Sequence, residues 1–232
     1  MTYVMGDLHG ALDRFCEMLE KIRFKNTDTL YILGDIVDKG ADSIKLLQNL
    51  SYRPNVYPVM GNHEKMALEL LSELPAEAGQ INPADFDEET LAKILAWSKD
   101  GGMPTISEFM KLSSDEKEGV LEYLEEMPPY EIAEVGGKVF VLAHAGIAGF
   151  DSSLELDSYE PEAFYSEGAD YTKQYFDKFY LVTAHTPTDE IDPSYQDKIY
   201  FGNNHIAIEC GTSDGGALAC YCLDNGKEYY VY

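Results

Sequence analysis

The 232-residue sequence predicts a layered α/β fold, and three observations support this prediction. Short apolar runs recur along the chain, and runs of about four to eight residues are typical of buried strands. The first three runs, at 2–5, 30–33 and 56–60, are each followed by a polar turn and a segment of helical apolar spacing. This alternation indicates helices packed against a sheet. The length and the apolar fraction of 45% suit one domain over residues 1–232.

The first third of the chain contains these strand–loop–helix units. The run at 2–5 precedes a helix expected over 11–23, whose apolar residues recur at helical spacing. The run at 30–33 ends at Gly34 and precedes a helix expected over 43–50. The run at 56–60 ends at Gly61, so three units follow one another before the pattern changes.

From 65 to about 127 the apolar spacing is helical. One helix is expected to end at Asp100-Gly101-Gly102, because glycine favours helix C-termini. Ser113 and Glu116 resemble a capping box for another helix, which Pro128 and Pro129 would stop. We interpret this block as a helical insertion beside the sheet rather than a separate domain.

Strand patterns resume after the insertion. Strands are expected over 138–143, 179–184, 206–210, 217–223 and 228–232. Asp224-Asn225-Gly226 indicates a hairpin turn between the last two. The stretch 150–169 is rich in tyrosine and acidic residues and shows no clear periodicity. We expect the helical insertion and this stretch to shape a groove at the sheet edge.

The charge balance restricts the partners of this protein. Acidic residues outnumber basic residues by 42 to 17, which gives a formal net charge of −25. Such a surface repels nucleic acid and anionic membranes, so neither is expected as a partner. It also repels a phosphorylated substrate, unless bound metal ions reverse the local sign of the charge.

No signal-peptide pattern or membrane-length apolar run occurs, which predicts a cytoplasmic protein of undetermined oligomeric state. The four cysteines, Cys16, Cys210, Cys220 and Cys222, are interpreted as packing residues.

Five apolar runs end at side chains that can bind a metal ion. In chain order these side chains are Asp7 and His9, Asp35, Asn62, His144 and His185. If the strands share a sheet, their carboxyl ends bring the side chains to one edge. Carboxylate, imidazole and amide ligands suit manganese, iron, zinc or magnesium rather than a thiolate-bound metal. Six ligands are too many for one ion with an open position and fit two ions about 3.5–4 Å apart.

A single histidine or aspartate in such a position is more often structural or solvated than a ligand. The distribution of the histidines argues for the metal hypothesis, since four of the five lie at these strand-end turns. The fifth, His205, is interpreted as an ordinary surface residue.

Three segments resemble the signature motifs of phosphoprotein phosphatases: Gly6-Asp7-Leu8-His9-Gly10, Gly34-Asp35-Ile36-Val37-Asp38-Lys39-Gly40 and Gly61-Asn62-His63-Glu64. The turns at His144 and His185 resemble the later histidine motifs of that family. Trp97, Gly101-Gly102, Thr105 and the glycines of the tail are similar to the short phage-lambda-type and bacterial branch. The resemblance spans nearly the whole chain. It implies a calcineurin-like metallophosphoesterase fold, a sandwich of two β-sheets flanked by helices.

The resemblance also implies roles for the motif residues. Asp7, His9 and Asp35 would hold one divalent ion, and Asp35, Asn62, His144 and His185 a second, with Asp35 bridging. His63 would protonate the leaving oxygen, and Asp38 would orient His63 and keep it protonated. Manganese is the ion expected to support activity in vitro, with iron, zinc, magnesium or cobalt as other candidates. The implied function is a phosphoserine/phosphothreonine protein phosphatase in which metal-activated water attacks phosphorus directly.

The sequence departs from that family at its phosphate-binding arginines. Lys39 replaces the arginine of the second motif, and Met60 stands where an arginine usually precedes the third. Lys39 is therefore the candidate substrate-binding residue, although it offers a point charge instead of a planar fork.

Two alternatives to a protein phosphatase stay open. The first is a hydrolase of a nucleotide or dinucleoside polyphosphate, with contacts from Tyr159, Tyr165 and Tyr171. Asp38 weighs against it, because symmetrical dinucleoside-tetraphosphate hydrolases commonly lack this aspartate. The second is a metal-binding interaction module with vestigial activity.

Overall fold

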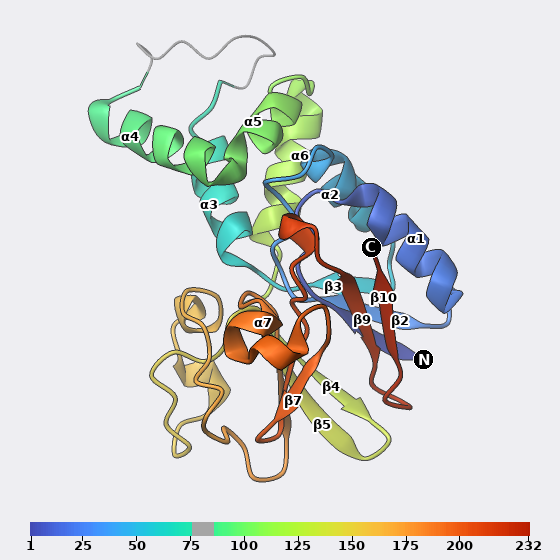
Figure 1. Ribbon diagram of the computed structural model, residues 1–232. Coiled ribbons are helices and arrows are strands. Elements are labelled where there is room, and N and C mark those ends of the chain that lie inside the picture. Colours follow the sequence, from blue (N-terminus) through green and yellow to red (C-terminus); the bar gives the residue numbers. More distant parts are fainter. Residues whose placement is uncertain (76–85) are drawn as a thin grey trace.

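A computed structural model describes residues 1–75 and 86–232 as two five-stranded sheets packed face to face (Figure 1). The strand orders are β10-β9-β1-β2-β3 and β4-β5-β6-β8-β7. Helices α1 (Leu12–Ile22) and α2 (Ser43–Ser51) lie beside the first sheet. The predicted α/β sandwich flanked by helices is confirmed. Residues 76–85 of the predicted insertion lie outside the described ranges.

The first sheet is built from the two ends of the chain. Strands β1 (Thr2–Met5), β2 (Thr29–Ile32) and β3 (Val56–Pro58) pair in parallel. Strand β9 (Leu218–Cys222) pairs antiparallel with β1 and with β10 (Glu228–Val231). The three parallel strands therefore place their carboxyl ends side by side.

The second sheet has a parallel centre and antiparallel edges. Strands β5 (Lys138–Ala143), β6 (Tyr180–Thr183) and β8 (His205–Ala207) run in parallel. The edge strands β4 (Tyr130–Val135) and β7 (Tyr200–Gly202) were not predicted. Both are mostly half-buried or exposed, so they lack the apolar run that marks the central strands.

Alternate side chains of the first sheet enter different cores, as the pleat of a strand requires. In β1, Val4 belongs to the layer between the two sheets, together with Leu142 and Val182 of the second sheet. Tyr3 and Met5 point the other way and belong to the core with α1 and α2. The sheets are therefore held together by a shared apolar layer, which fixes the relative position of their edges.

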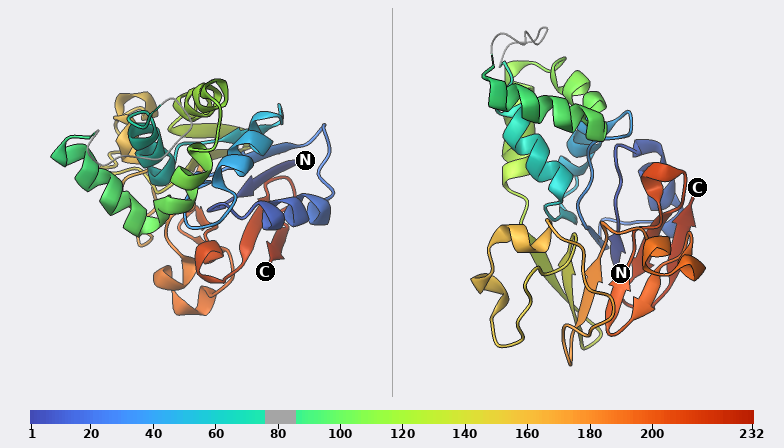
Figure 2. Two further views of the ribbon diagram at one scale, coloured as in Figure 1. Left: turned by 90° about the horizontal axis from the view of Figure 1, so that it is seen from above. Right: turned by 60° about the vertical axis from the view of Figure 1, so that its left-hand side comes forward.

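The helical insertion stands at one end of the sandwich (Figure 2). It comprises α3 (Asn62–Leu71), α4 (Glu88–Trp97), a π-helical turn (Ser98–Gly102), α5 (Met103–Phe109) and α6 (Ser114–Glu125). Ser113 caps α6 through a capping box with Glu116, as predicted. The expected stop at 100–102 is instead a bend, since Gly101 adopts a φ of 101° and the chain continues into α5.

The remaining segments are short. The stretch 150–169 contains two 3₁₀ turns, Leu156–Ser158 and Pro161–Phe164, and α7 (Thr188–Ile191) follows β6. Within the described ranges, none of the helices combines the length and apolarity that crossing a bilayer requires.

The surface interpretation of His205 is wrong. The side chain is 1% exposed on β8, where Nε2 lies 2.8 Å from Thr183 Oγ1 and the ring stacks on Tyr171. The polar turn before it ends at Asn204, and the next residue enters a strand that pairs with β6. Its position in the sheet, rather than its polar neighbours, determines its burial.

Candidate metal centre

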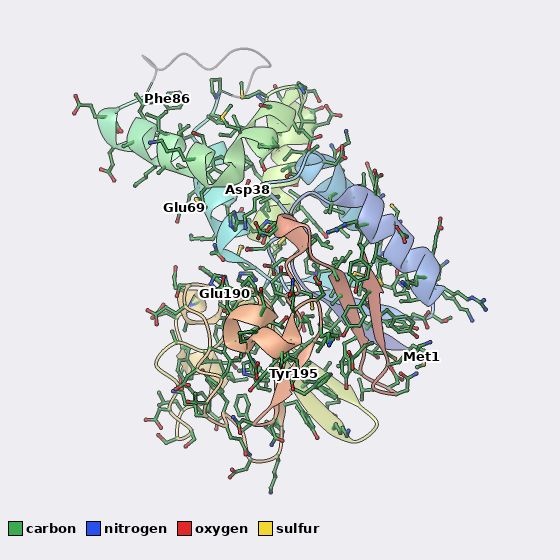
Figure 3. All side chains as sticks on the ribbon, in the orientation of Figure 1. Met1, Asp38, Glu69, Phe86, Glu190 and Tyr195 are labelled. Atoms are coloured by element: carbon green, nitrogen blue, oxygen red, sulfur yellow. The ribbon has the colours of Figure 1, made fainter. Side chains whose placement is uncertain are left out.

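All six residues predicted as metal ligands lie where the carboxyl ends of strands from both sheets converge. Asp7 and His9 follow β1, Asp35 follows β2, and Asn62 begins α3 directly after β3. His144 follows β5 and His185 follows β6 of the other sheet. Figure 3 shows the neighbouring Asp38 where the helical insertion meets the sandwich.

Asp35 is the centre of this group. One of its carboxylate oxygens, Oδ1, lies 3.3 Å from Nε2 of His144, and the other, Oδ2, lies 3.7 Å from Nε2 of His9. Two sets of potential ligands therefore share Asp35, one with His9 and His63 and the other with His144 and His185. Within each set the donor atoms lie no more than 4.8 Å apart.

Asp7 and Asn62 complete the group. Oδ2 of Asp7 lies 3.8 Å from Nε2 of His9, and Oδ1 of Asp7 accepts the backbone N–H of His185 at 3.3 Å. Oδ1 of Asn62 lies 2.8 Å from Nε2 of His144 and 3.1 Å from Nδ1 of His185. The six side chains thus face one another across the two sheets.

The imidazoles present lone pairs rather than protons to this group. Nδ1 of His9 donates to Val37 O at 3.0 Å, and Nδ1 of His144 donates to Leu33 O at 2.6 Å. Each bond leaves Nε2 as an acceptor, which is the arrangement of metal-binding histidines. Burial lowers the pKa of His9 and of His185 to about 4 each and also lowers that of His144. Neutral imidazole is the form that binds a metal ion.

A buried carboxylate that sequence reasoning missed adds to this fit. Glu209 is 3% exposed, and its Oε1 accepts the backbone N–H groups of Gly211 and Thr212, but its Oε2 has no partner among the described residues. Burial, together with the charges of Glu209 and then Asp35, raises the pKa of Asp7 well above its ordinary value. Bound cations would compensate these carboxylates, so the donor set fits divalent ions.

The backbone of the site is strained at several of these residues. His9, Asp35, Asp38, Lys39 and His185 have positive φ angles of 42°, 48°, 71°, 61° and 62°. Left-handed conformations are uncommon for residues other than glycine, and they persist where surrounding contacts enforce them. Strained positions of this kind cluster at functional sites, which supports a functional reading of these turns.

Glu64 is the contact that enforces the turn at Asp35, and its role was not predicted. This fully buried carboxylate accepts the backbone N–H groups of Asp35, Ile36 and Val37 at 2.6, 2.7 and 3.0 Å. It also accepts the N–H of Gly61 at 3.1 Å. Glu64 therefore joins the second motif to the third. The only sequence signal was its place directly after Asn62 and His63.

Replacement of Glu64 by glutamine should destabilise the protein. The amide NH₂ cannot accept, so buried backbone N–H groups lose their partner at about 1–3 kcal/mol for each unsatisfied group. We expect the free energy of unfolding to fall by about 2–4 kcal/mol, measured by urea denaturation. Glu69→Gln on the exposed side of α3 is the matched control and should change it by about 0.5 kcal/mol or less. Equal effects of the two substitutions would contradict the role of Glu64.

His63 and Asp38 form a buried pair beside the ligand group. Nδ1 of His63 donates to Oδ2 of Asp38 at 2.7 Å, and its Nε2 lies 3.8 Å from Oδ2 of Asp35. Burial lowers the pKa of His63, but the Asp38 hydrogen bond and the charges of Asp35 and Asp38 outweigh it and raise the pKa to about 9. A protonated imidazole can donate a proton from Nε2 at neutral pH.

Lys39 extends its side chain to the edge of the ligand group. Nζ of this exposed residue lies 3.2 Å from Nε2 of His9 and 3.4 Å from Oγ of Ser213. Arg14 instead donates to the carbonyl oxygens of Thr212 and Gly216. Met60, where the resemblance expected an arginine, is buried in the core with α1 and α2. Lys39 therefore places a cation at the exposed edge of this group.

The three tyrosines considered for a nucleotide are engaged in packing. Tyr165 is buried in the core that α1, α2 and the insertion share, and Tyr171 stacks on His205. Tyr159 packs against Phe164, and its hydroxyl accepts the backbone N–H of Asp151. Contacts from these side chains to a substrate are not supported by their positions.

Comparison with known proteins gives three results. A family model described as calcineurin-like phosphoesterase matches residues 2–231. A symmetrical bis(5'-nucleosyl)-tetraphosphatase of Nitrosomonas europaea is 34% identical over 135 residues, or 57% of this chain and 47% of that protein. A protein of the same name from Acidovorax sp. is 32% identical over 147 residues, or 62% of this chain and 43% of that protein. These matches cover less than half the length of either relative.

Two solved structures share the fold. A protein provisionally described as a diadenosine tetraphosphatase superposes with a TM-score of 0.65 at 22% identity and covers 99% of this chain and 92% of its own. A protein serine/threonine phosphatase of Saccharomyces cerevisiae gives a TM-score of 0.56 at 15% identity, over 100% of this chain and 80% of its own. At these identities the likeness concerns the fold alone.

The expectation of a serine/threonine protein phosphatase is wrong on these comparisons. The curated relatives are named as symmetrical dinucleoside tetraphosphatases, so the first alternative is favoured. The motifs could not separate the two classes, because the residues they contain describe a metal centre and a proton donor. Both classes of phosphoester hydrolysis can use such groups.

Proposed function

The chain belongs to the calcineurin-like phosphoesterase family, and we propose that its substrate is a dinucleoside polyphosphate or a related nucleotide. The family membership makes the protein a metallophosphoesterase and weighs against an inert interaction module. The observation that carries the proposal is the pair of ligand sets that share the buried carboxylate of Asp35. The naming of the curated relatives supports the substrate class.

The proposed metal ligands are the six side chains that converge at the carboxyl ends of the strands. Asp7, His9 and Asp35 would hold one ion, and Asp35, Asn62, His144 and His185 the other. Two divalent ions at such a centre lower the pKa of a bound water and bind phosphoryl oxygens. Manganese is the proposed ion in vitro. Oxygen and imidazole donors without thiolate are compatible with it, as they are with iron, zinc or magnesium.

His63 is the proposed general acid of the reaction. During hydrolysis a water oxygen forms a bond to phosphorus while the bond to the leaving oxygen breaks. The Nε2 proton of His63 would neutralise the charge that develops on that oxygen, and Asp38 accepts the hydrogen bond from Nδ1 on the opposite side of the ring. The leaving group would be a nucleotide phosphate oxygen.

Lys39 is the proposed contact to the polyphosphate chain. A substrate with several phosphates brings several negative charges to a protein with a net charge of −25. The ammonium of Lys39 lies beside His9, at the exposed edge of the ligand group, where it could offset part of this repulsion. The residue is exposed, and the ammonium is carried on a flexible side chain that could follow a flexible substrate.

The proposal is tested with a substrate panel in the presence of Mn²⁺. The panel contains diadenosine tetraphosphate, ATP, p-nitrophenyl phosphate, phenyl phosphate and a phosphoserine peptide, with products separated by anion-exchange chromatography. We expect diadenosine tetraphosphate to be cleaved with the highest kcat/KM and to yield nucleoside diphosphate. A chelator should abolish turnover, and Mn²⁺ should restore it.

Each outcome of the panel has a defined meaning. Cleavage of the aryl phosphates without cleavage of diadenosine tetraphosphate would reject the proposed substrate class. The proposal that the protein is a phosphoester hydrolase would still stand. Absence of turnover on every substrate by metal-loaded protein would reject the enzymatic proposal.

A further inference from the structure

The helical insertion contacts the turn that carries Asp38 and Lys39 at three points. Nε1 of Trp97, the last residue of α4, donates to Oδ2 of Asp38 at 2.6 Å. Oγ1 of Thr105, in α5, donates to Oδ1 of Asp38 at 2.6 Å. The carbonyl oxygen of Gly101, between the two helices, accepts the backbone N–H of Lys39 at 2.8 Å.

These contacts meet a strained segment. Asp38 and Lys39 are consecutive residues with φ angles of 71° and 61°. Such conformations cost free energy and persist only where the surroundings restrain them. Asp38 is fully buried, and its backbone N–H is shared between Ser43 Oγ at 2.9 Å and Thr105 Oγ1 at 3.1 Å. Thr105 therefore holds both the backbone and the side chain of Asp38.

The close approach of the insertion depends on two glycines. A Cβ on Gly101 would lie 2.7 Å from Cγ of Lys39, and one on Gly102 would lie 2.5 Å from Cε2 of Trp97. The bend between α4 and α5 thus lets the indole of Trp97 reach Asp38 while Gly101 packs against Lys39. The π-helical turn makes this bend, and a continuous α-helix would not provide it.

The carboxylate of Asp38 is restrained at both oxygens. Oδ1 accepts from Thr105, and Oδ2 accepts from Trp97 and from Nδ1 of His63. A carboxylate held at one oxygen can still rotate about its Cβ–Cγ bond, whereas donors on both oxygens fix its plane. The plane of the Asp38 carboxylate in turn determines the direction in which Nε2 of His63 points.

We propose that Trp97 and Thr105 are positioning residues that aim His63 at the leaving oxygen through Asp38. The helical insertion is then part of the proton-donating apparatus and not an accessory to the fold. This inference rests on the role of His63 proposed above. It assigns a function to two donors that approach Asp38 from 59 and 67 residues along the chain.

The inference predicts a dependence on the leaving group. A poor leaving group needs the proton of His63, whereas a good leaving group departs with little protonation. Removal of a hydrogen-bond donor to Asp38 should therefore slow the hydrolysis of phenyl phosphate more than that of p-nitrophenyl phosphate. A general loss of stability or of bound metal would slow the hydrolysis of both esters equally.

The test compares Thr105→Val, Thr105→Ser and Trp97→Phe with the wild-type enzyme. Thr105→Val should lower kcat for phenyl phosphate roughly tenfold more than kcat for p-nitrophenyl phosphate, because a hydrogen bond to a charged group is lost. KM and bound manganese should stay unchanged, and Thr105→Ser should restore the rates. Trp97→Phe should act in the same direction. Ile106→Val, a buried neighbour on α5, is the control and should affect both esters equally.

A spectroscopic readout makes the test independent of turnover. In protein loaded with diamagnetic Mg²⁺, the Nδ1 proton of His63 should give a downfield ¹H NMR signal that is absent in His63→Asn. In Thr105→Val this signal should broaden and exchange faster with solvent, while Thr105→Ser retains it. An unchanged signal, or equal rate losses on the two esters, would overturn the positioning role. Wild-type protein that hydrolyses no substrate would instead reject the proposed function, and the signal would still decide the inference.

Discussion

Replacement of Asp35 by asparagine is expected to reduce hydrolysis to the background rate. This carboxylate is common to both ligand sets, and its two oxygens face His144 and His9 on opposite sides. An amide offers one neutral oxygen and an NH₂ group that repels cations, so neither set keeps its shared anionic ligand. The measurements are turnover with Mn²⁺ and metal content by elemental analysis after dialysis.

The expected metal content of Asp35→Asn is at most one ion per chain, against two for the wild-type protein. Asp13→Asn, which changes an exposed carboxylate on α1, is the matched control and should retain both ions and normal turnover. Two bound ions with a normal rate in Asp35→Asn would show that Asp35 does not bridge the sets.

Replacement of His63 by asparagine is expected to lower kcat by about 10²–10⁴-fold, the usual contribution of a general acid. The amide of asparagine can still donate to Oδ2 of Asp38, so the buried pair keeps a hydrogen bond and the fold should persist. The measurements are kcat for phenyl phosphate, metal content and the midpoint of thermal unfolding.

Metal content distinguishes the two roles that the position of His63 allows. The ring lies in one ligand set with His9 and Asp35, although the proposed first ion is held by Asp7 instead. A general acid can be removed while both ions stay bound. Loss of one ion in His63→Asn would identify His63 as a ligand and would refute its assignment as the proton donor.

The convergence of these six side chains could be predicted because each lies at the end of an apolar run or in the turn that follows it. A parallel strand brings its carboxyl end to the sheet edge, so the position of Asp35 after β2 or of His185 after β6 is encoded locally. Glu209 follows β8 in the structure but lies inside the strand expected over 206–210, so the same rule did not identify it. The two edge strands and the buried position of His205 were missed, because pairing with a neighbouring strand determines them.

The substrate class could not be obtained from the motifs. In the proposed site, Asp7, His9, Asp35 and Asn62 would hold the metal ions, and His63 would deliver the proton. The same groups serve phosphate monoesters and polyphosphate chains. The substitution of lysine at position 39 indicated a departure from the protein phosphatases but did not name the alternative.

The sequence by itself determined the layered fold and the residues that gather at its edge, because strand, turn and ligand are neighbours along the chain. Only the tertiary structure showed how those residues are held. Glu64 accepts hydrogen bonds from the turn at Asp35, 29 residues earlier in the sequence. Trp97 and Thr105 donate to Asp38, which lies 59 and 67 residues before them. Such contacts leave no periodic signal, since they form only when the insertion packs against the sandwich.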